Sequence, residues 1–211
     1  LTGAVDLEID RGRAVGAYNA VTALDSGGEI VGSYAKAHLV PYGEYLALRW
    51  LLEPLGATRL VPGALDFIPG PGPRTLDLGP HGLVGVQICY EIIFSGHVVD
   101  PSRRPDFIYN PSNDGWFGPS GPPQHLAQAR LRAIEEGLPV LRATTTGISA
   151  VIDARGVVRA HVPRLEAGRI DGLVPPPGEP TLFARLGNPL ALFWAVAFLF
   201  AGSVVRRRTA R

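Results

Sequence analysis

The chain has 211 residues, 46% of them hydrophobic and 18% charged, which is enough for one domain with a buried core but too short for two large ones. A formal net charge of +1 excludes the strongly basic surface of a nucleic-acid-binding protein, and the single cysteine excludes an internal disulfide. Glycine (26 residues) and proline (20 residues) make up more than a fifth of the chain, which indicates many turns and a strand-rich or mixed fold.

The first part of the chain predicts two short strands, followed by its only lysine. Residues 18–24 and 29–34 are β-prone, and Asp25-Ser-Gly-Gly28 between them is typical of a hairpin turn. Lys36 comes next; every other basic residue is an arginine, which favours a function for a compact ammonium group at this position.

Two segments of different character follow the lysine. Residues 44–55 are rich in leucine and also contain Trp50, and they predict a short helix that is either buried in the core or faces lipid. Residues 62–80 are rich in proline and glycine and predict a loop.

The second half of the chain predicts five short strands, at 83–88, 106–110, 140–143, 149–152 and 157–162. Cys89 lies at the end of the first of these strands, directly before a helical-looking segment. The second strand runs into a polar and aromatic loop, Pro111-Ser-Asn-Asp-Gly-Trp-Phe-Gly118. Since loops after strand ends are where α/β folds gather functional side chains, both loops are candidate site segments.

Two helices are expected between these strands. The shorter covers 90–99, and the clearer covers 122–136, with prolines in its first turn and Gly137 and Pro139 after its end. Its apolar face is expected to contain Leu126, Ala129, Ala133 and Ile134. The order of elements favours a mixed α/β layer fold.

The C-terminal segment predicts a membrane anchor. Residues 189–205 are 17 consecutive residues without a charge, followed at once by three arginines. A terminal apolar run closed by arginines is typical of a transmembrane helix whose basic end is cytoplasmic, although a buried core helix is the alternative. We therefore expect the globular part to lie on the opposite face of the membrane. The chain begins at Leu1 and contains no methionine, so we expect upstream sequence.

The cysteine and the lysine together indicate nucleophilic chemistry. A cysteine at a strand-to-helix turn gains from the helix dipole, and a nearby ammonium group stabilises both the thiolate and an oxyanion, so a lowered Cys89 pKa is expected. A base must also accept the thiol proton. The candidates are Glu44, Glu91, His38 and His125. The scattered histidines show no metal-ligand spacing, so neither a metal nor a cofactor is expected.

Each residue also has a plainer interpretation. A lone cysteine is most often an inert buried side chain, and most lysines are solvated surface charges. Trp116 and Phe117 could be core aromatics, and Arg132 with Glu136 has the spacing of an ordinary helix ion pair.

Taken together, the motifs resemble a known family. They are Lys36-Ala-His-Leu-Val-Pro-Tyr-Gly-Glu44, Cys89-Tyr-Glu91, Asn113-Asp-Gly-Trp-Phe117, Gln124-His125 and Ala129-Arg-Leu-Arg-Ala-Ile-Glu135. Over residues 18–190 this pattern resembles the nitrilase superfamily, and specifically its apolipoprotein N-acyltransferase branch.

The resemblance implies an αββα sandwich, here partial because its N-terminal part is missing, followed by one transmembrane helix. It divides the chain into a nitrilase-like catalytic domain (1–174), a linker (175–188), a transmembrane helix (189–205) and a basic cytoplasmic tail (206–211). It also implies a bacterial inner-membrane location, with the catalytic domain on the periplasmic or extracellular face.

The chemistry implied by the resemblance is two-step acyl transfer. A phospholipid's sn-1 acyl chain moves onto Cys89 as a thioester, and the amine of a diacylglyceryl-cysteine lipoprotein then takes it as an amide. Lys36 matches the oxyanion lysine and Glu44 a second active-site glutamate, Tyr90 and Glu91 flank the nucleophile, and Trp116 is a substrate-side aromatic.

One family residue has no counterpart in this chain. The general-base glutamate of the family lies tens of residues upstream of the lysine motif, and Glu8 does not match its setting. We therefore expect the base outside this chain, which alone would be inactive. Two other readings stay open: a membrane-anchored amidase of the same superfamily, and a truncated non-catalytic domain.

Overall fold

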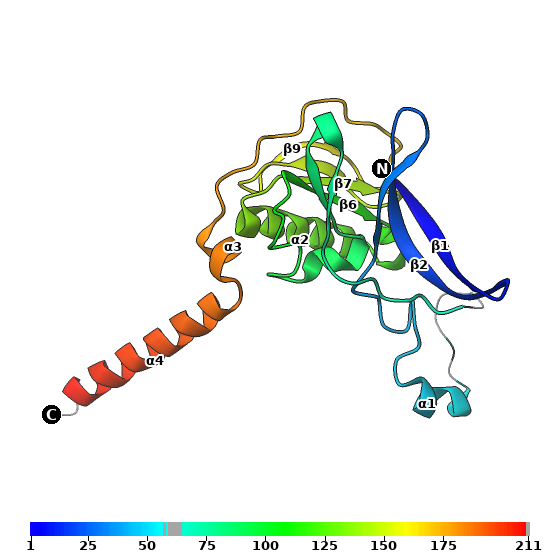
Figure 1. The fold of residues 1–211 in the computed structure, drawn as a ribbon. Coiled ribbons are helices and arrows are strands. Elements are labelled where there is room, and N and C mark those ends of the chain that lie inside the picture. The colour runs from blue at the N-terminus through cyan, green and yellow to red at the C-terminus, as the bar shows by residue number, and fades with distance from the viewer. Residues whose placement is uncertain (57, 59–64, 210–211) are drawn as a thin grey trace.

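The computed structural model describes residues 1–56, 58 and 65–209 (Figure 1). Its strands are β1 (Thr2–Asp10), β2 (Arg13–Leu24), β3 (Ile30–Ala35), β4 (Thr75–Asp77), β5 (Leu83–Val86), β6 (Phe107–Ser112), β7 (Val140–Thr144), β8 (Ser149–Ile152) and β9 (Val158–Val162). Its α-helices are α1 (Arg49–Leu52), α2 (Gly121–Glu136), α3 (Leu182–Leu186) and α4 (Pro189–Thr209). Short 3-10 helices are η1 (Glu53–Leu55), η2 (Gly79–His81), η3 (Cys89–Ile93) and η4 (Asp114–Trp116).

The strands form two sheets. The first is an antiparallel sheet in the order β1-β2-β3, and the second is a mixed sheet in the order β4-β5-β6-β7-β8-β9. In the mixed sheet β5, β6 and β7 are parallel, whereas the flanking strands pair antiparallel. The carboxyl ends of the three parallel strands therefore lie along one edge of the sheet.

A buried apolar layer joins the two sheets. Val21 of β2 and Tyr34 of β3 pack in one cluster with Val84 and Val86 of β5 and Phe107 of β6. Because side chains alternate across a strand, these residues leave the intervening positions for the other face of the mixed sheet. The two sheets thus share one core.

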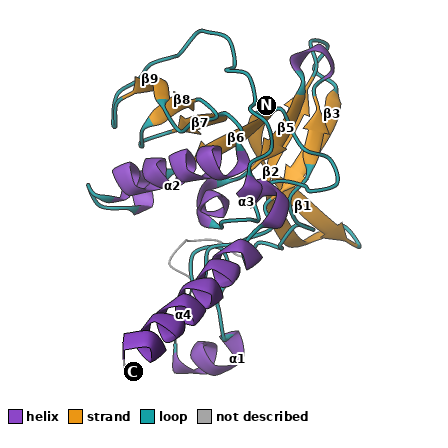
Figure 2. Ribbon diagram, turned by 90° about the vertical axis from the view of Figure 1, so that its left-hand side faces the viewer, coloured by secondary structure: helices purple, strands orange, loops and turns teal. Residues whose placement is uncertain are grey.

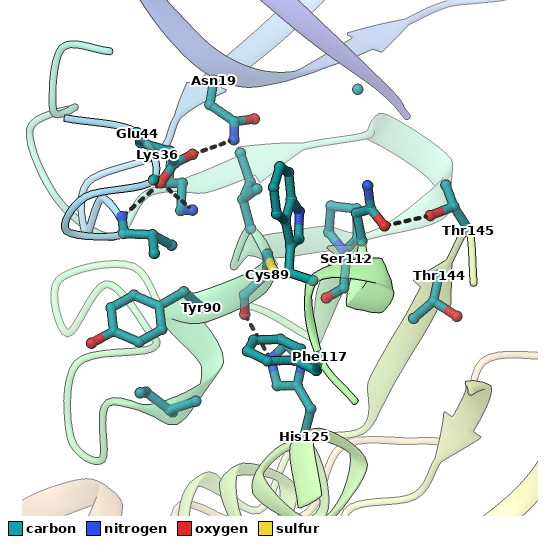
Figure 3. A pocket seen from close by; sticks show the side chains of 18 of the residues that line it. Asn19, Lys36, Glu44, Cys89, Tyr90, Ser112, Phe117, His125, Thr144 and Thr145 are labelled. Atoms are coloured by element: carbon teal, nitrogen blue, oxygen red, sulfur yellow. Dashed lines mark hydrogen bonds and ion pairs between the residues drawn. The ribbon is translucent and has the colours of Figure 1, made fainter. Parts of the chain in front are cut away.

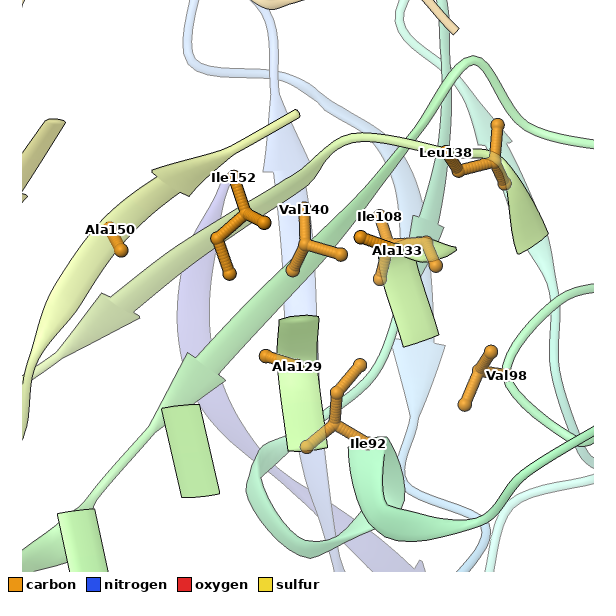
Figure 4. Packing of buried hydrophobic residues seen from close by; sticks show 9 residues of the cluster. All are labelled: Ile92, Val98, Ile108, Ala129, Ala133, Leu138, Val140, Ala150 and Ile152. Carbon is orange, nitrogen blue, oxygen red and sulfur yellow. The ribbon is translucent and has the colours of Figure 1, made fainter. Parts of the chain in front are cut away.

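The other face of the mixed sheet is covered by α2 (Figures 2 and 4). Ile108, next to Phe107 on β6, packs there with Val140 of β7 and with Ala129 and Ala133 of α2. The alanines let the helix approach the sheet closely. By contrast, the edge strand β1 has no buried residue. The described residues therefore form three layers, α, β and β, of the expected αββα sandwich.

Most predicted elements are present, with four corrections. The helix expected over 44–55 is limited to α1 and η1, because Leu48 adopts a left-handed conformation and Pro54 interrupts it. The helix expected over 90–99 ends at Ile93 as a 3-10 turn. Ile134 is 48% exposed rather than on the buried face. The loop expected over 62–80 contains β4 and η2, and its residues 62–64 lie outside the described part.

The C-terminal segment forms α4, which extends away from the two sheets (Figures 1 and 2). Phe198, Leu199 and Phe200 are each more than 70% exposed on it. Within the part of the chain that the structure describes, however, no helix combines the length and apolar character needed to cross a membrane. The transmembrane prediction for 189–205 is therefore not confirmed.

Replacing a side chain between α2 and the mixed sheet should destabilise the fold. Ile108 is fully buried, so Ile108→Ala should lower the free energy of unfolding by about 2–5 kcal/mol through lost burial and the cavity left behind. Ile30→Ala is the matched control, because Ile30 is 69% exposed and its loss should cost less than about 0.5 kcal/mol. Pulse proteolysis across a urea series measures both; equal shifts would contradict the packing described here.

Candidate active site

Cys89 occupies a strained turn at the end of β5. Its φ angle is +51°, in the left-handed region that costs a non-glycine residue about 1–3 kcal/mol. The chain before it is held to β6, because the Gln87 amide donates to the Tyr109 carbonyl (2.9 Å) and the Gln87 carbonyl accepts from Asn110 Nδ2 (2.6 Å). Cys89 then begins η3. The order of strand, cysteine and helical turn is as the sequence predicts.

The ends of the three parallel strands meet at one cavity of about 1130 Å³ (Figure 3). Cys89 follows β5, Asn113 follows β6, and Thr144 ends β7, and all three line the cavity. From the other sheet, β2 contributes Asn19 and the segment after β3 contributes Lys36. The lining is mostly apolar.

Lys36 and Glu44 form a buried ion pair beside Cys89. Lys36 Nζ lies 2.6 Å from Glu44 Oε2, and Lys36 is only 2% exposed. Glu44 also accepts from Asn19 Nδ2 (2.7 Å) and from the Val40 amide (2.7 Å). The carboxylate therefore holds the ammonium group in one place, and it offsets part of the ammonium's charge.

Glu91 joins the loop that contains Cys89 to the loop that contains Lys36. Its Oε1 accepts from Tyr34 Oη (2.7 Å) and from the amides of Ala37 (2.7 Å) and His38 (3.1 Å), while Oε2 accepts from the Ile88 amide (2.7 Å). Burial raises the pKa of the Glu91 carboxyl, and these donors act in the opposite direction. Glu91 is 1% exposed.

The pKa of the Cys89 thiol is raised, whereas the sequence predicts a lowered pKa. Burial raises its pKa above the ordinary value, and the Asp114 charge adds to this. Lys36, the Asn113 amide and Arg142 lower it, but not enough to reverse the shift. The expectation was wrong because burial disfavours the thiolate more than Lys36, Arg142 and the Asn113 amide favour it. A protonated thiol needs a base.

The two histidines named as base candidates do not face the thiol sulfur. The His38 ring stacks on Phe94, with 4.4 Å between ring centroids. His125 Nε2 lies 3.1 Å from the Cys89 carbonyl oxygen rather than facing the sulfur. The other two candidates are Glu44, which pairs with Lys36, and Glu91, which accepts from Tyr34 and three backbone amides.

Two charged residues of the site were missed from the sequence. Arg142 of β7 is buried and donates to both carboxylate oxygens of Asp114, at 2.9 and 2.7 Å. Burial would raise the pKa of Asp114, but the hydrogen bond from His125 and the charge of Arg142 outweigh burial and lower it. The sequence did contain a signal for this pair. Arg142 lies within a predicted apolar strand, and a buried charge needs a partner of opposite charge.

Three aromatic residues line the cavity with Cys89. Tyr90 contacts Phe94 edge-on, with centroids 5.0 Å apart, and it lines the cavity. Trp116 and Phe117 also line the cavity and are 61% and 45% exposed, so they are not core aromatics. Arg132 pairs with Glu135 rather than with Glu136. Among the described residues, no group of three or more histidine, cysteine or acidic side chains is arranged to hold a metal ion.

This geometry agrees with comparison to known proteins. Residues 2–176 match the carbon-nitrogen hydrolase family. The chain belongs to that family. An amidase from Nesterenkonia sp. has a similar fold to this carbon-nitrogen hydrolase chain, with a TM-score of 0.55 and 16% identity, over 79% of this chain and 57% of the amidase.

Two curated relatives of this carbon-nitrogen hydrolase chain are named apolipoprotein N-acyltransferase. The protein from Rhodopseudomonas palustris is 42% identical over 99% of this chain and 39% of its own length. The protein from Bradyrhizobium diazoefficiens is 43% identical over 100% of this chain and 40% of its own length. The chain thus spans about two fifths of the length of these relatives.

The raised thiol pKa has a direct chemical consequence. The rate of Cys89 alkylation by iodoacetamide should rise with pH, with an inflection above that of glutathione measured in parallel, because burial disfavours the thiolate. Lys36→Met removes a cation that lowers this pKa, so it should move the inflection higher still. Peptide mass spectrometry after timed quenching measures both rates; an inflection below that of glutathione would contradict this electrostatic account.

Proposed function

We propose that this chain is part of an acyltransferase that moves a fatty acyl chain from phospholipid to the N-terminal amine of diacylglyceryl-cysteine lipoproteins. The observation that carries the proposal is that Cys89, Lys36 and Glu44 meet in one large, mostly apolar cavity. The names of the relatives supply the substrate class.

In the first proposed step, Cys89 Sγ attacks the carbonyl carbon of the phospholipid's sn-1 ester. A sulfur–carbon bond forms, the carbon–oxygen ester bond breaks, and lysophospholipid leaves with the proton that the thiol gave up. The raised thiol pKa requires a base for that proton. We assign this base to a glutamate outside the chain.

Stabilisation of the oxyanion falls to groups fixed around Cys89. Lys36 supplies a buried positive charge, and the Tyr90 amide belongs to the first turn of η3, where amides have no intrahelical acceptor. Glu44 orients Lys36, and Glu91 holds the turn by accepting a hydrogen bond from the Ile88 amide. In the second step the lipoprotein amine attacks the thioester carbon. The carbon–nitrogen amide bond forms, the carbon–sulfur bond breaks, and the proton lost by the amine restores the Cys89 thiol.

The size and lining of the cavity favour lipid over a small polar amide. Its volume of about 1130 Å³ exceeds the ~300–1,000 Å³ typical of small-ligand sites, and its lining is mostly apolar. An amidase would be favoured by a small polar pocket. Trp116, exposed at the cavity, is assigned to contact substrate.

A membrane surface is the proposed setting. α4 presents exposed Phe198, Leu199 and Phe200, and the segment that contains α1 and η1 presents exposed Trp50 and Leu55. Clustered exposed apolar side chains mark membrane or protein contacts. We assign the domain (1–174), through its linker (175–188), to the periplasmic face of a bacterial inner membrane. In this assignment residues 189–205 enter lipid and 206–211 reach the cytoplasm.

Removing the nucleophile should abolish transfer. In the full-length protein, Cys89→Ser should lower turnover by more than about 1,000-fold, because a serine hydroxyl is a far weaker nucleophile than the thiol in this setting. The assay follows N-acylation of a diacylglyceryl-cysteine peptide by mass spectrometry, with phospholipid as donor. Undiminished transfer by a Cys89→Ser protein of unchanged protease resistance would refute the assignment.

Arginine should not replace Lys36. The buried site holds a compact ammonium group 2.6 Å from Glu44 Oε2, and a planar guanidinium has a different shape and donor pattern, so Lys36→Arg should lower kcat about 100-fold or more. Arg169→Lys, at an exposed position 86% accessible, is the matched control and should leave kcat unchanged. A Lys36→Arg protein with full activity would show that charge alone suffices.

A further inference from the structure

His125 contacts the backbone of the nucleophile rather than its sulfur. From α2, its Nε2 lies 3.1 Å from the Cys89 carbonyl oxygen (Figure 3). A carbonyl oxygen can only accept a hydrogen bond, so Nε2 must carry the hydrogen. This contact therefore assigns His125 as a donor to the Cys89 carbonyl.

The other ring nitrogen of His125 is held by a buried charge pair. Nδ1 lies 2.9 Å from Asp114 Oδ1 and 3.1 Å from Arg142 Nη2. A neutral ring accepts from Arg142, and a protonated ring donates to Asp114; in both states Nε2 keeps its hydrogen. Arg142 also donates to Ser112 Oγ at 3.0 Å. Asp114 of η4 and Arg142 of β7 thus hold the ring, and Ser112 of β6 in turn accepts from Arg142.

The Cys89 carbonyl and the Tyr90 amide belong to one planar peptide unit. In a trans peptide these two groups point in opposite directions. Figure 3 shows His125 on one side of Cys89 and the Lys36–Glu44 pair on the other. A carbonyl held toward His125 therefore directs the Tyr90 N–H toward the side where Lys36 lies.

We propose that His125 is a positioning residue that sets the Cys89–Tyr90 peptide so that its N–H joins Lys36 in binding the oxyanion. The left-handed φ of Cys89 makes such a restraint necessary, because a cysteine does not favour this conformation by itself. This inference rests on one part of the proposed function, namely that Cys89 is a nucleophile that accepts the acyl group.

Three substitutions separate this function from simple packing. His125→Gln places an amide nitrogen where Nε2 lies, so it keeps the donor to Cys89. His125→Asn reaches only as far as Nδ1, and His125→Phe keeps the ring shape and the edge-on contact with Phe117 but has no donor. His161→Gln, at an exposed position on β9, is the matched control.

The test uses the full-length protein with p-nitrophenyl octanoate as acyl donor. Cys89 Sγ bonds to the acyl carbon, p-nitrophenolate leaves, and the thiol proton passes to buffer, so the phenolate burst reports thioester formation alone. The Asn and Phe variants should acylate about 10- to 100-fold more slowly with KM unchanged within about twofold, whereas Gln should recover most of the rate. The His161→Gln protein should acylate at the same rate as the protein without substitutions.

Alkylation of Cys89 by iodoacetamide is the second readout, because displacement at a saturated carbon forms no oxyanion. It should change less than about threefold in all variants. Equal burst rates for Gln and Asn, or a parallel loss of alkylation and acylation, would overturn the proposal. The predicted burst pattern without any transfer to a diacylglyceryl-cysteine peptide would support the role of His125 and refute the proposed lipoprotein substrate.

Discussion

The carboxylate of Glu91 is the interaction on which the site depends most. It is buried, and four donors from two loops converge on it: the Tyr34 hydroxyl and the amides of Ala37, His38 and Ile88. The first three belong to the segment around Lys36, and the last precedes Cys89. Without this carboxylate, these four donors would lose their acceptor, and the two segments would lose their common anchor. The position of the ammonium group relative to the thiol therefore follows from one side chain.

The electrostatics of the site assign different tasks to its charges. Lys36 is close enough to lower the thiol pKa, yet burial prevails and Glu44 shares the ammonium group's charge. A thiol that stays protonated is protected from stray electrophiles until a base acts. In the proposed mechanism Lys36 acts on the oxyanion, because a fixed charge in a mostly apolar cavity has a large effect there. The charges of Asp114 and Arg142 act on the thiol pKa in opposite directions, and the pair also contacts His125, which lies against the Cys89 backbone.

Motifs with strict spacing were predictable from the sequence. Properties that depend on contacts between distant segments, such as a pKa or a buried ion pair, were not. Cys89 at a strand end and Lys36 after a hairpin could be located because local patterns determine them, and the structure places both at one cavity. The Cys89 pKa could not, since it depends on burial and on Lys36, Asn113, Asp114 and Arg142 at once. β1 was missed although Val5, Leu7 and Ile9 alternate with acidic residues, which is a strand period. The pairing of Asp114 with Arg142 needed the parallel register of β6 and β7.

The central claim is that Cys89 carries an acyl group between two substrates. Intact-mass analysis of the full-length protein after incubation with phospholipid in detergent tests it most directly. The account predicts a mass increase of one fatty acyl chain that hydroxylamine removes and that peptide mapping assigns to Cys89. A folded protein that binds phospholipid and gains no such adduct would contradict the account.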